Sequence, residues 1–189
     1  MTKIIIFVDP ERCIGCYACV IACKMEHNLP PYPASPPVAE PKGLRLIRVF
    51  QVGPEIKNDK VYQYFVPVSC MHCDDPPCMY SCPVKAISKG EDGVVRVDRE
   101  KCTGCKMCFW ACPYGAPQFT SEGKMIICDL CIDNLQSGRK VACEANCPTK
   151  CIYIGTQNEI YAQVGQRFIS KLRKFYELLM KLHDLLHLQ

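Results

Sequence analysis

The sequence predicts an α+β fold in which short β-hairpins and helices surround groups of cysteines, followed by a C-terminal helix. First, the chain has 17 cysteines among 189 residues, and sixteen of them fall into four groups. Second, short β-branched runs between the groups are bounded by turn residues, which is typical of hairpins. Third, residues 166–188 contain neither Pro nor Gly and carry one apolar stripe with helical spacing.

The third cysteine group is the most informative stretch of the chain. Residues 102–113 read C-x2-C-x2-C-x3-C-P, which is the spacing of a bacterial ferredoxin iron–sulfur site. Gly104 supplies the backbone freedom that such a tight turn needs. Residues 13–23 repeat this spacing, with Lys24 in place of the final Pro, so we expect a longer helix there. The fourth cysteine of such a site binds a neighbouring cluster, so one site implies a second.

The second and fourth groups have the same order of cysteines, with extra residues before the third cysteine. Residues 70–83 read C-x2-C-x4-C-x3-C-P, and residues 128–148 contain C-x2-C, eleven further residues, and C-x3-C-P. An odd cysteine count fits a disulfide framework poorly. Zinc needs only two cysteine pairs and has no use for a third cysteine two residues after the second. The spacing therefore favours four [4Fe–4S] clusters. The remaining Cys151 is interpreted as a small apolar residue that begins a strand.

The first half of the chain contains three predicted strands and one loop. Residues 3–8 form a short strand before the first cysteine group. The proline-rich residues 27–41 predict an extended surface loop. Residues 44–52 and 61–68 then predict two strands, joined by a turn through Gly53, Asn58 and Asp59.

The second half contains shorter elements. Residues 86–97 and 114–127 each predict a hairpin, turned at 89–93 and 121–123. A helical turn with a break at Ser137 and Gly138 is expected within residues 132–142, and a strand at 151–154. The helix at 166–188 either packs on its own domain or docks on another chain.

Composition excludes several classes of function. No stretch of about 20 apolar residues occurs, so no membrane span is expected. The formal net charge of +4 counts every cysteine as neutral, and metal-bound thiolates move the balance negative. The basic excess is thus no argument for nucleic acid. The chain shows no nucleotide fingerprint or nucleophile motif, so it is not expected to be an enzyme by itself.

The ordered cysteine groups resemble the four-cluster electron-transfer subunits of molybdenum and tungsten oxidoreductases. The Cys-x-His-Cys-x2-Pro-Pro-Cys of residues 70–78 and the eleven-residue gap after Cys131 are similar to that family in detail. The family includes the β subunits of dimethyl-sulfoxide reductase and formate dehydrogenase. The resemblance implies two intertwined ferredoxin-like modules with pseudo-two-fold symmetry. The first comprises residues 1–23 and 128–160, and the second residues 70–127. Residues 24–69 connect them, and residues 161–189 are the C-terminal helix.

The resemblance also implies a crossed ligation of the clusters. Each group gives three cysteines to one cluster and its last cysteine to the module partner. The implied ligands are Cys13, Cys16, Cys19 and Cys147 for cluster A; Cys128, Cys131, Cys143 and Cys23 for cluster B; Cys70, Cys73, Cys78 and Cys112 for cluster C; and Cys102, Cys105, Cys108 and Cys82 for cluster D. His72 and Trp110 are candidates for groups that contact a cluster from outside its ligand set.

These observations predict an electron-transfer subunit that relays single electrons through four clusters. The partner implied by the resemblance is a catalytic tungsten or molybdenum subunit, with a further flavin-containing or membrane subunit as the electron acceptor or donor. The C-terminal helix could also mediate self-association. A free-standing soluble polyferredoxin, the iron–sulfur subunit of a hydrogenase or carbon-monoxide dehydrogenase complex, and a zinc-stabilised interaction protein are the alternatives. No signal peptide is seen, which favours the cytoplasm, with export on a partner's signal as the alternative.

Overall fold

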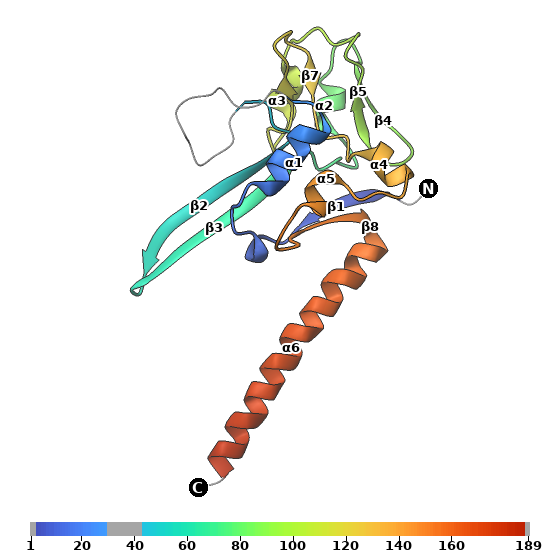
Figure 1. Ribbon diagram of the computed structural model, residues 1–189. Coiled ribbons are helices and arrows are strands. Elements are labelled where there is room, and N and C mark those ends of the chain that lie inside the picture. Colours follow the sequence, from blue (N-terminus) through green and yellow to red (C-terminus); the bar gives the residue numbers. More distant parts are fainter. Residues whose placement is uncertain (1–2, 30–42, 188–189) are drawn as a thin grey trace.

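A computed structural model describes residues 3–29 and 43–187 of the chain (Figure 1). It combines helices with four separate two-stranded antiparallel sheets, as expected for the α+β class. Most of the predicted proline-rich loop, residues 30–41, lies outside the described residues.

Two strands that are far apart in the sequence, one near each end of the cysteine-containing region, pair in one sheet. β1 (Ile4–Val8) pairs antiparallel with β8 (Ile152–Thr156), with Ile6 opposite Ile154. Both strands confirm the sequence prediction, and β8 continues two residues beyond it. A short 3-10 helix, Pro10–Arg12, follows β1 and leads into the first cysteine group. The sheet therefore brings the first group close to the segment that follows the fourth.

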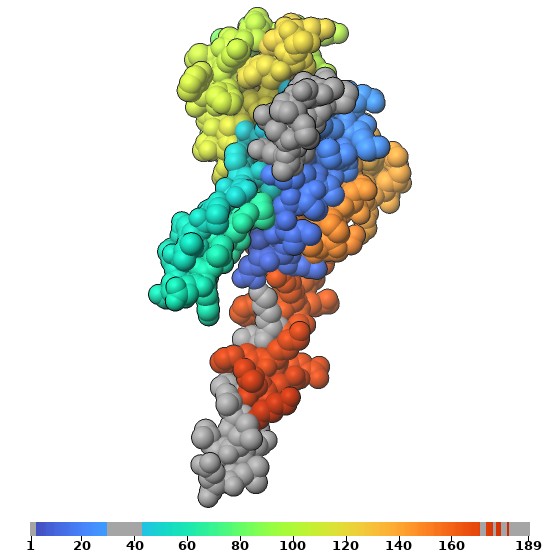
Figure 2. Space-filling view, turned by 60° about the vertical axis from the view of Figure 1, so that its left-hand side comes forward, coloured from blue at the N-terminus to red at the C-terminus, as the bar shows by residue number. Residues whose placement is uncertain are grey.

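A long ribbon of β2 (Ile47–Lys57) and β3 (Lys60–Ser69) projects from the body (Figures 1 and 2). The two predicted strands are confirmed, but the predicted position of the turn is partly wrong. Asn58 and Asp59 make the turn, whereas Gly53 lies within β2, where the pairing register shifts between Val52 and Glu55. A bulge accommodates the extra residues, and the strands continue past it.

The predicted hairpins of the second half are confirmed. β4 (Ile87–Lys89) pairs with β5 (Val95–Val97), and β6 (Gln118–Phe119) pairs with β7 (Met125–Ile126). The predicted helical turn within residues 132–142 is α4 (Ile132–Gln136), which ends before Ser137, and α5 (Ala142–Ala145) follows it.

Short helices follow the cysteine loops. They are α1 (Ala18–Glu26), α2 (Pro77–Tyr80) and α3 (Met107–Ala111). α1 is longer than α3, as expected from Lys24, because a lysine can continue a helix at the position where Pro113 cannot donate a backbone hydrogen bond.

Among the described residues, the buried apolar side chains form two cores. One core gathers around the first and fourth cysteine groups and includes Val20, Leu130 and Ile152. The other gathers around the second and third groups and includes Ile87, Val95 and Met125. Cysteines lie inside both cores, so each core encloses potential metal ligands.

The C-terminal helix α6 (Gln157–His187) begins at Gln157 rather than at the predicted residue 166. The missed start signal is a capping box. Thr156 Oγ1 accepts a hydrogen bond from Glu159 N at 3.3 Å, and Glu159 Oε2 accepts one from Thr156 N at 2.8 Å. Gly165 lies within the helix and does not end it.

The first part of α6 is anchored to the body. Ile160 is buried against it, and Arg167 forms ion pairs with Asp9 and Glu11. Beyond this point the helix extends away from the body in both views (Figures 1 and 2). No helix in the described residues is both long and apolar enough to cross a membrane.

Candidate metal centres

The loops of the first and third cysteine groups share one backbone design. Gly15 and Gly104 both have a positive φ, and so do Tyr17 and Lys106, which directly precede α1 and α3. These left-handed residues reverse the direction of the backbone, so that successive cysteine side chains converge. At Gly104 a Cβ atom would lie 2.5 Å from the Gly123 carbonyl oxygen, so only glycine fits there.

The clearest convergence joins the third group to the last cysteine of the second. Cys102, Cys105, Cys108 and Cys82 line one cavity, together with apolar side chains that include Met125. Cys82 thus lies with three cysteines that are distant from it in the sequence. This is the set that the resemblance implies for cluster D.

The first group lies close to a cysteine of the fourth. Burial and, after it, the neighbouring thiols of Cys13, Cys147 and Cys16 raise the pKa of Cys19 to about 12. Cys147 is the last cysteine of the fourth group, so its proximity spans most of the sequence. The β1–β8 sheet described above accounts for this proximity.

The second group lies close to a cysteine of the third. Burial raises the pKa of Cys70 to about 12, with contributions from the thiols of Cys78, Cys112 and Cys73. Cys112 is the last cysteine of the third group. Cys78 has a raised pKa for the same reasons: burial first, then the thiols of Cys112 and Cys73.

The fourth group lies close to the last cysteine of the first. Burial raises the pKa of Cys23, and the thiols of Cys128 and Cys131 add to this effect. Cys143 shows the same behaviour: its pKa is raised by burial and by the thiols of Cys23 and Cys131. The grouped cysteines therefore form four assemblies, and in each assembly three cysteines of one group lie near one cysteine of another.

The chemistry of these donor sets fits a metal cluster. All 17 cysteines are free thiols. Several buried thiols in one place cannot ionise together, because each thiolate would repel the others in a medium of low polarity. A bound metal centre removes this obstacle and leaves the coordinating thiols deprotonated. Backbone N–H groups also point at cysteine sulfurs, as in the 3.2 Å hydrogen bond from Ala86 N to Cys82 Sγ. Such bonds stabilise a metal-bound thiolate.

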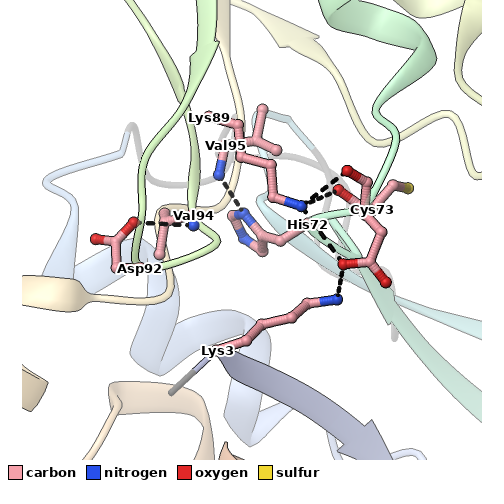
Figure 3. Close-up of polar contacts among 8 residues, drawn as sticks. Lys3, His72, Cys73, Lys89, Asp92, Val94 and Val95 are labelled. Carbon is pink, nitrogen blue, oxygen red and sulfur yellow. Dashed lines mark hydrogen bonds and ion pairs between the residues drawn. The ribbon is translucent and has the colours of Figure 1, made fainter. Parts of the chain in front are cut away.

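His72 lies inside the second loop, as Figure 3 shows. Its side chain is almost fully buried, with a residue exposure of 1%, and its Nδ1 accepts a hydrogen bond from Val95 N at 2.9 Å. Burial lowers the pKa of His72 to about 4, so the ring is neutral. Because Nδ1 is an acceptor, the proton resides on Nε2. In the described part of the chain, this buried Nε2 has no hydrogen-bond partner.

The same loop is fixed by two lysines (Figure 3). Lys89 Nζ donates hydrogen bonds to the Cys73 carbonyl oxygen at 2.8 Å and to the Asp74 carbonyl oxygen at 3.0 Å. Lys3, which precedes β1, forms an ion pair with the Asp74 carboxylate. The N-terminal end of the chain is therefore tied to the second cysteine loop.

Trp110 differs from His72 in its surroundings. It lies on α3, but 83% of it is exposed, and its ring packs edge-on against Phe109 with the ring centroids 5.6 Å apart. Its contact with a cluster stays a prediction.

His27 lies at the start of the segment for which the sequence predicts a proline-rich loop. In the structure it directly follows α1, and its Nε2 lies 3.6 Å from Cys131 Sγ and 3.5 Å from Asp129 Oδ1. The signal in the sequence is its position four residues after Cys23, which places it one helical turn further along the same helix face. His27 thus borders the fourth cysteine group.

Comparison with known proteins also indicates iron–sulfur clusters. A family model described as a 4Fe-4S dicluster domain matches residues 61–157, and one described as a 4Fe-4S binding domain matches residues 4–25. A component of the anaerobic dimethyl sulfoxide reductase of Escherichia coli is 38% identical over 160 residues, which cover 84% of this chain and 76% of that protein.

Two further relatives come from other bacteria. A subunit of the sulfite dehydrogenase of Allochromatium vinosum is 37% identical, with 87% of this chain and 73% of that protein covered. The formate dehydrogenase iron-sulfur subunit of Wolinella succinogenes is 30% identical, with 87% of each chain covered.

Proposed function

This protein belongs to the iron–sulfur electron-transfer subunits of the molybdenum and tungsten oxidoreductase family. We therefore propose that it is the wire of such a complex, that is, the row of clusters along which electrons pass from one partner subunit to another. It binds several [4Fe–4S] clusters, transfers electrons for a catalytic subunit and is not catalytic by itself. Four clusters would carry single electrons between a tungsten- or molybdenum-containing subunit and an electron acceptor or donor. The four assemblies of converging cysteines are the observation that carries this proposal.

We propose the crossed ligation for all sixteen grouped cysteines. Its support is that each assembly combines three cysteines of one group with the last cysteine of another. The cavity lined by Cys102, Cys105, Cys108 and Cys82 is the most direct support. The two apolar cores gather around the cysteine groups of the two proposed modules, residues 1–23 with 128–160 and residues 70–127, which supports this division. A pseudo-two-fold axis between the modules is part of the same proposal. When bound, the clusters supply one-electron chemistry, and the cysteines hold them within the two cores.

Contacts between assemblies support a linear order of the clusters. The thiol of Cys78 raises the pKa of Cys108 after burial, which favours cluster C beside cluster D. Cys70 contributes to the raised pKa of the half-buried Cys128, which packs against the core that contains Cys70, and this favours cluster B beside cluster C. Cys19 contributes to the raised pKa of Cys143, which favours cluster A beside cluster B. We therefore infer the order D–C–B–A, with clusters D and A at the two ends of the wire.

The proposed partners are a catalytic metal subunit and a further electron-transferring subunit that carries a flavin or anchors the complex in a membrane. The exposed apolar residues of α6, including Phe168 and Phe175, support docking of this helix on another chain. Self-association through the same helix is the competing assignment. We assign the complex to the cytoplasm, where thiols stay reduced, with export alongside a partner as the alternative.

The proposal is tested by the native mass of the complex purified anaerobically from its source. We expect a companion protein that contains molybdenum or tungsten, together with a visible iron–sulfur spectrum. A lone chain with four clusters would instead indicate a free-standing ferredoxin. A colourless, redox-silent protein that contains zinc would contradict the proposal that the chain transfers electrons.

We also propose that His72 donates its Nε2–H to a sulfur of a neighbouring cluster. The His72→Leu variant should show a lower reduction potential of one cluster, because a hydrogen bond to sulfur favours the reduced, more negative state. Its thermal midpoint should fall by about 2–12 °C, since the buried Val95 N–H also loses its acceptor at a cost of about 1–3 kcal/mol. Anaerobic redox titration and thermal unfolding measure the two effects.

The His72→Gln variant is the matched control, because its side-chain carbonyl can still accept the Val95 hydrogen bond. We expect it to recover most of the stability. If the potentials of His72→Leu equal those of the natural protein, His72 has only a packing role.

A further inference from the structure

Three of the four cysteine groups end with the same hydrogen bond. The residue four positions after the last cysteine donates its backbone N–H to the sulfur of that cysteine. The bond joins Ala86 N to Cys82 Sγ at 3.2 Å, Ala116 N to Cys112 Sγ at 3.4 Å and Cys151 N to Cys147 Sγ at 3.3 Å. The three segments are therefore structurally equivalent.

The fourth group departs from this pattern in its side chain. The donor residue is alanine in two groups, and both alanines are buried. In the fourth group it is Cys151, which is only 2% exposed and whose Sγ lies 3.5 Å from Cys147 Sγ. The sequence predicts for Cys151 a small apolar residue that begins a strand. The structure places it directly before β8, but with its thiol against another sulfur.

Which of the two cysteines donates in this contact follows from whether each sulfur carries a proton. A metal-bound Cys147 has lost its proton and can only accept a hydrogen bond. The thiol of Cys151 is a free cysteine in an apolar core, where the neutral S–H form is favoured. The S–H group must therefore be the donor and the Cys147 sulfur the acceptor. Thr149 Oγ1, 3.7 Å from the same sulfur, is a further neighbour that can donate.

We propose that Cys151 is a potential-setting residue of cluster A. Its S–H group gives the Cys147 sulfur one more hydrogen bond than the equivalent sulfurs of Cys82 and Cys112 receive from their alanine segments. The inference rests on the proposed ligation of cluster A by Cys147. Reduction adds negative charge to a cluster, and a donor to its sulfur stabilises that charge. The reduction potential of cluster A is therefore higher than it would be with alanine at position 151.

The Cys151→Ala variant tests this directly, because it installs the residue that the two equivalent segments already have. An S–H group is a weak donor, so the expected effect is moderate. We expect the one-electron reduction equilibrium constant of cluster A to fall about threefold, or about 28 mV at 59 mV per tenfold change. Anaerobic redox titration followed by electron paramagnetic resonance measures the potentials, and iron analysis counts the clusters.

Two variants serve as controls. Cys151→Ser keeps a hydroxyl donor at the same position and should retain or raise the potential. Ala86→Cys introduces a thiol at the equivalent position beside Cys82 and should raise the potential of cluster D instead. The cluster signals are identified in a separate Cys16→Ser variant, which perturbs the cluster of the first group.

Each outcome has one meaning. A fall confined to cluster A, with unchanged iron content, supports the proposal. Unchanged potentials overturn it. A loss of about one quarter of the iron also overturns it, because Cys151 would then be a ligand. A shift in a different cluster shows that the proposed ligation by Cys147 is wrong, while the hydrogen bond from Cys151 still sets a potential.

Discussion

Replacing Cys112 with serine is expected to remove the cluster of the second cysteine group, although Cys112 belongs to the third. Cys112 lies beside Cys70 and Cys78, whose pKa values its thiol helps to raise. Its sulfur accepts a hydrogen bond from Ala116 N at 3.4 Å, which fixes its direction. Without this thiolate, the remaining three cysteines hold an incomplete ligand set. The protein should lose about one quarter of its iron.

The loss should also interrupt electron transfer along the protein. Cluster C lies between clusters D and B in the inferred order, so its removal separates the two ends of the wire. We expect reduction of the far clusters from either end to become much slower, while the remaining clusters keep their spectra. Iron analysis, electron paramagnetic resonance and stopped-flow reduction measure the three effects.

The matched control for this experiment is Cys105→Ser. Cys105 belongs to the same group as Cys112, but it lines the cavity assigned to cluster D. The two variants should therefore lose different clusters. If both lose the cluster of Cys102, Cys105 and Cys108, the crossed ligation is wrong.

Much of this arrangement could be predicted from local patterns in the sequence. Cysteine spacing, Gly104 and the turn residues of the two short hairpins each act over a few neighbouring residues. The β4–β5 and β6–β7 hairpins are predictable for that reason. The crossed pairing comes from the family resemblance, because spacing within one group says nothing about which distant cysteine approaches it.

The features that were missed depend on contacts or on competing local signals. Gly53 is typical of a turn, yet cross-strand pairing resumes at Glu55 opposite Tyr62, so Gly53 lies in a bulge. The helix α6 starts earlier than predicted because the capping box at Thr156 outweighs the helix-weakening effect of Gly165. The role of Cys151 depends on its 3.5 Å approach to Cys147, which no sequence pattern shows.

Placing acidic residues on the apolar side of α6 should detach the protein from its companion without disturbing the clusters. Arg167 anchors the first part of the helix through Asp9 and Glu11, and the projecting part begins directly after it. Phe168 and Phe175 are two helical turns apart, lie on one side, and are 62% and 56% exposed. Large aromatic side chains in such positions are typical anchors of a protein interface.

The Phe168→Glu, Phe175→Glu double variant should therefore weaken binding of the companion about a thousandfold, because two anchors that become buried in the interface are each worth about 2 kcal/mol. Iron content and reduction potentials should stay unchanged, since neither side chain lies in the two cores.

The matched control is the double variant Arg173→Gln, Lys174→Gln, because it changes the net charge by the same amount at exposed polar positions. Native mass measurements of both variants distinguish the two kinds of docking. Loss of a metal-containing companion supports docking on the catalytic complex, and loss of a larger homo-oligomer assigns the helix to self-association. If the companion remains bound to the double variant, α6 is not the docking element.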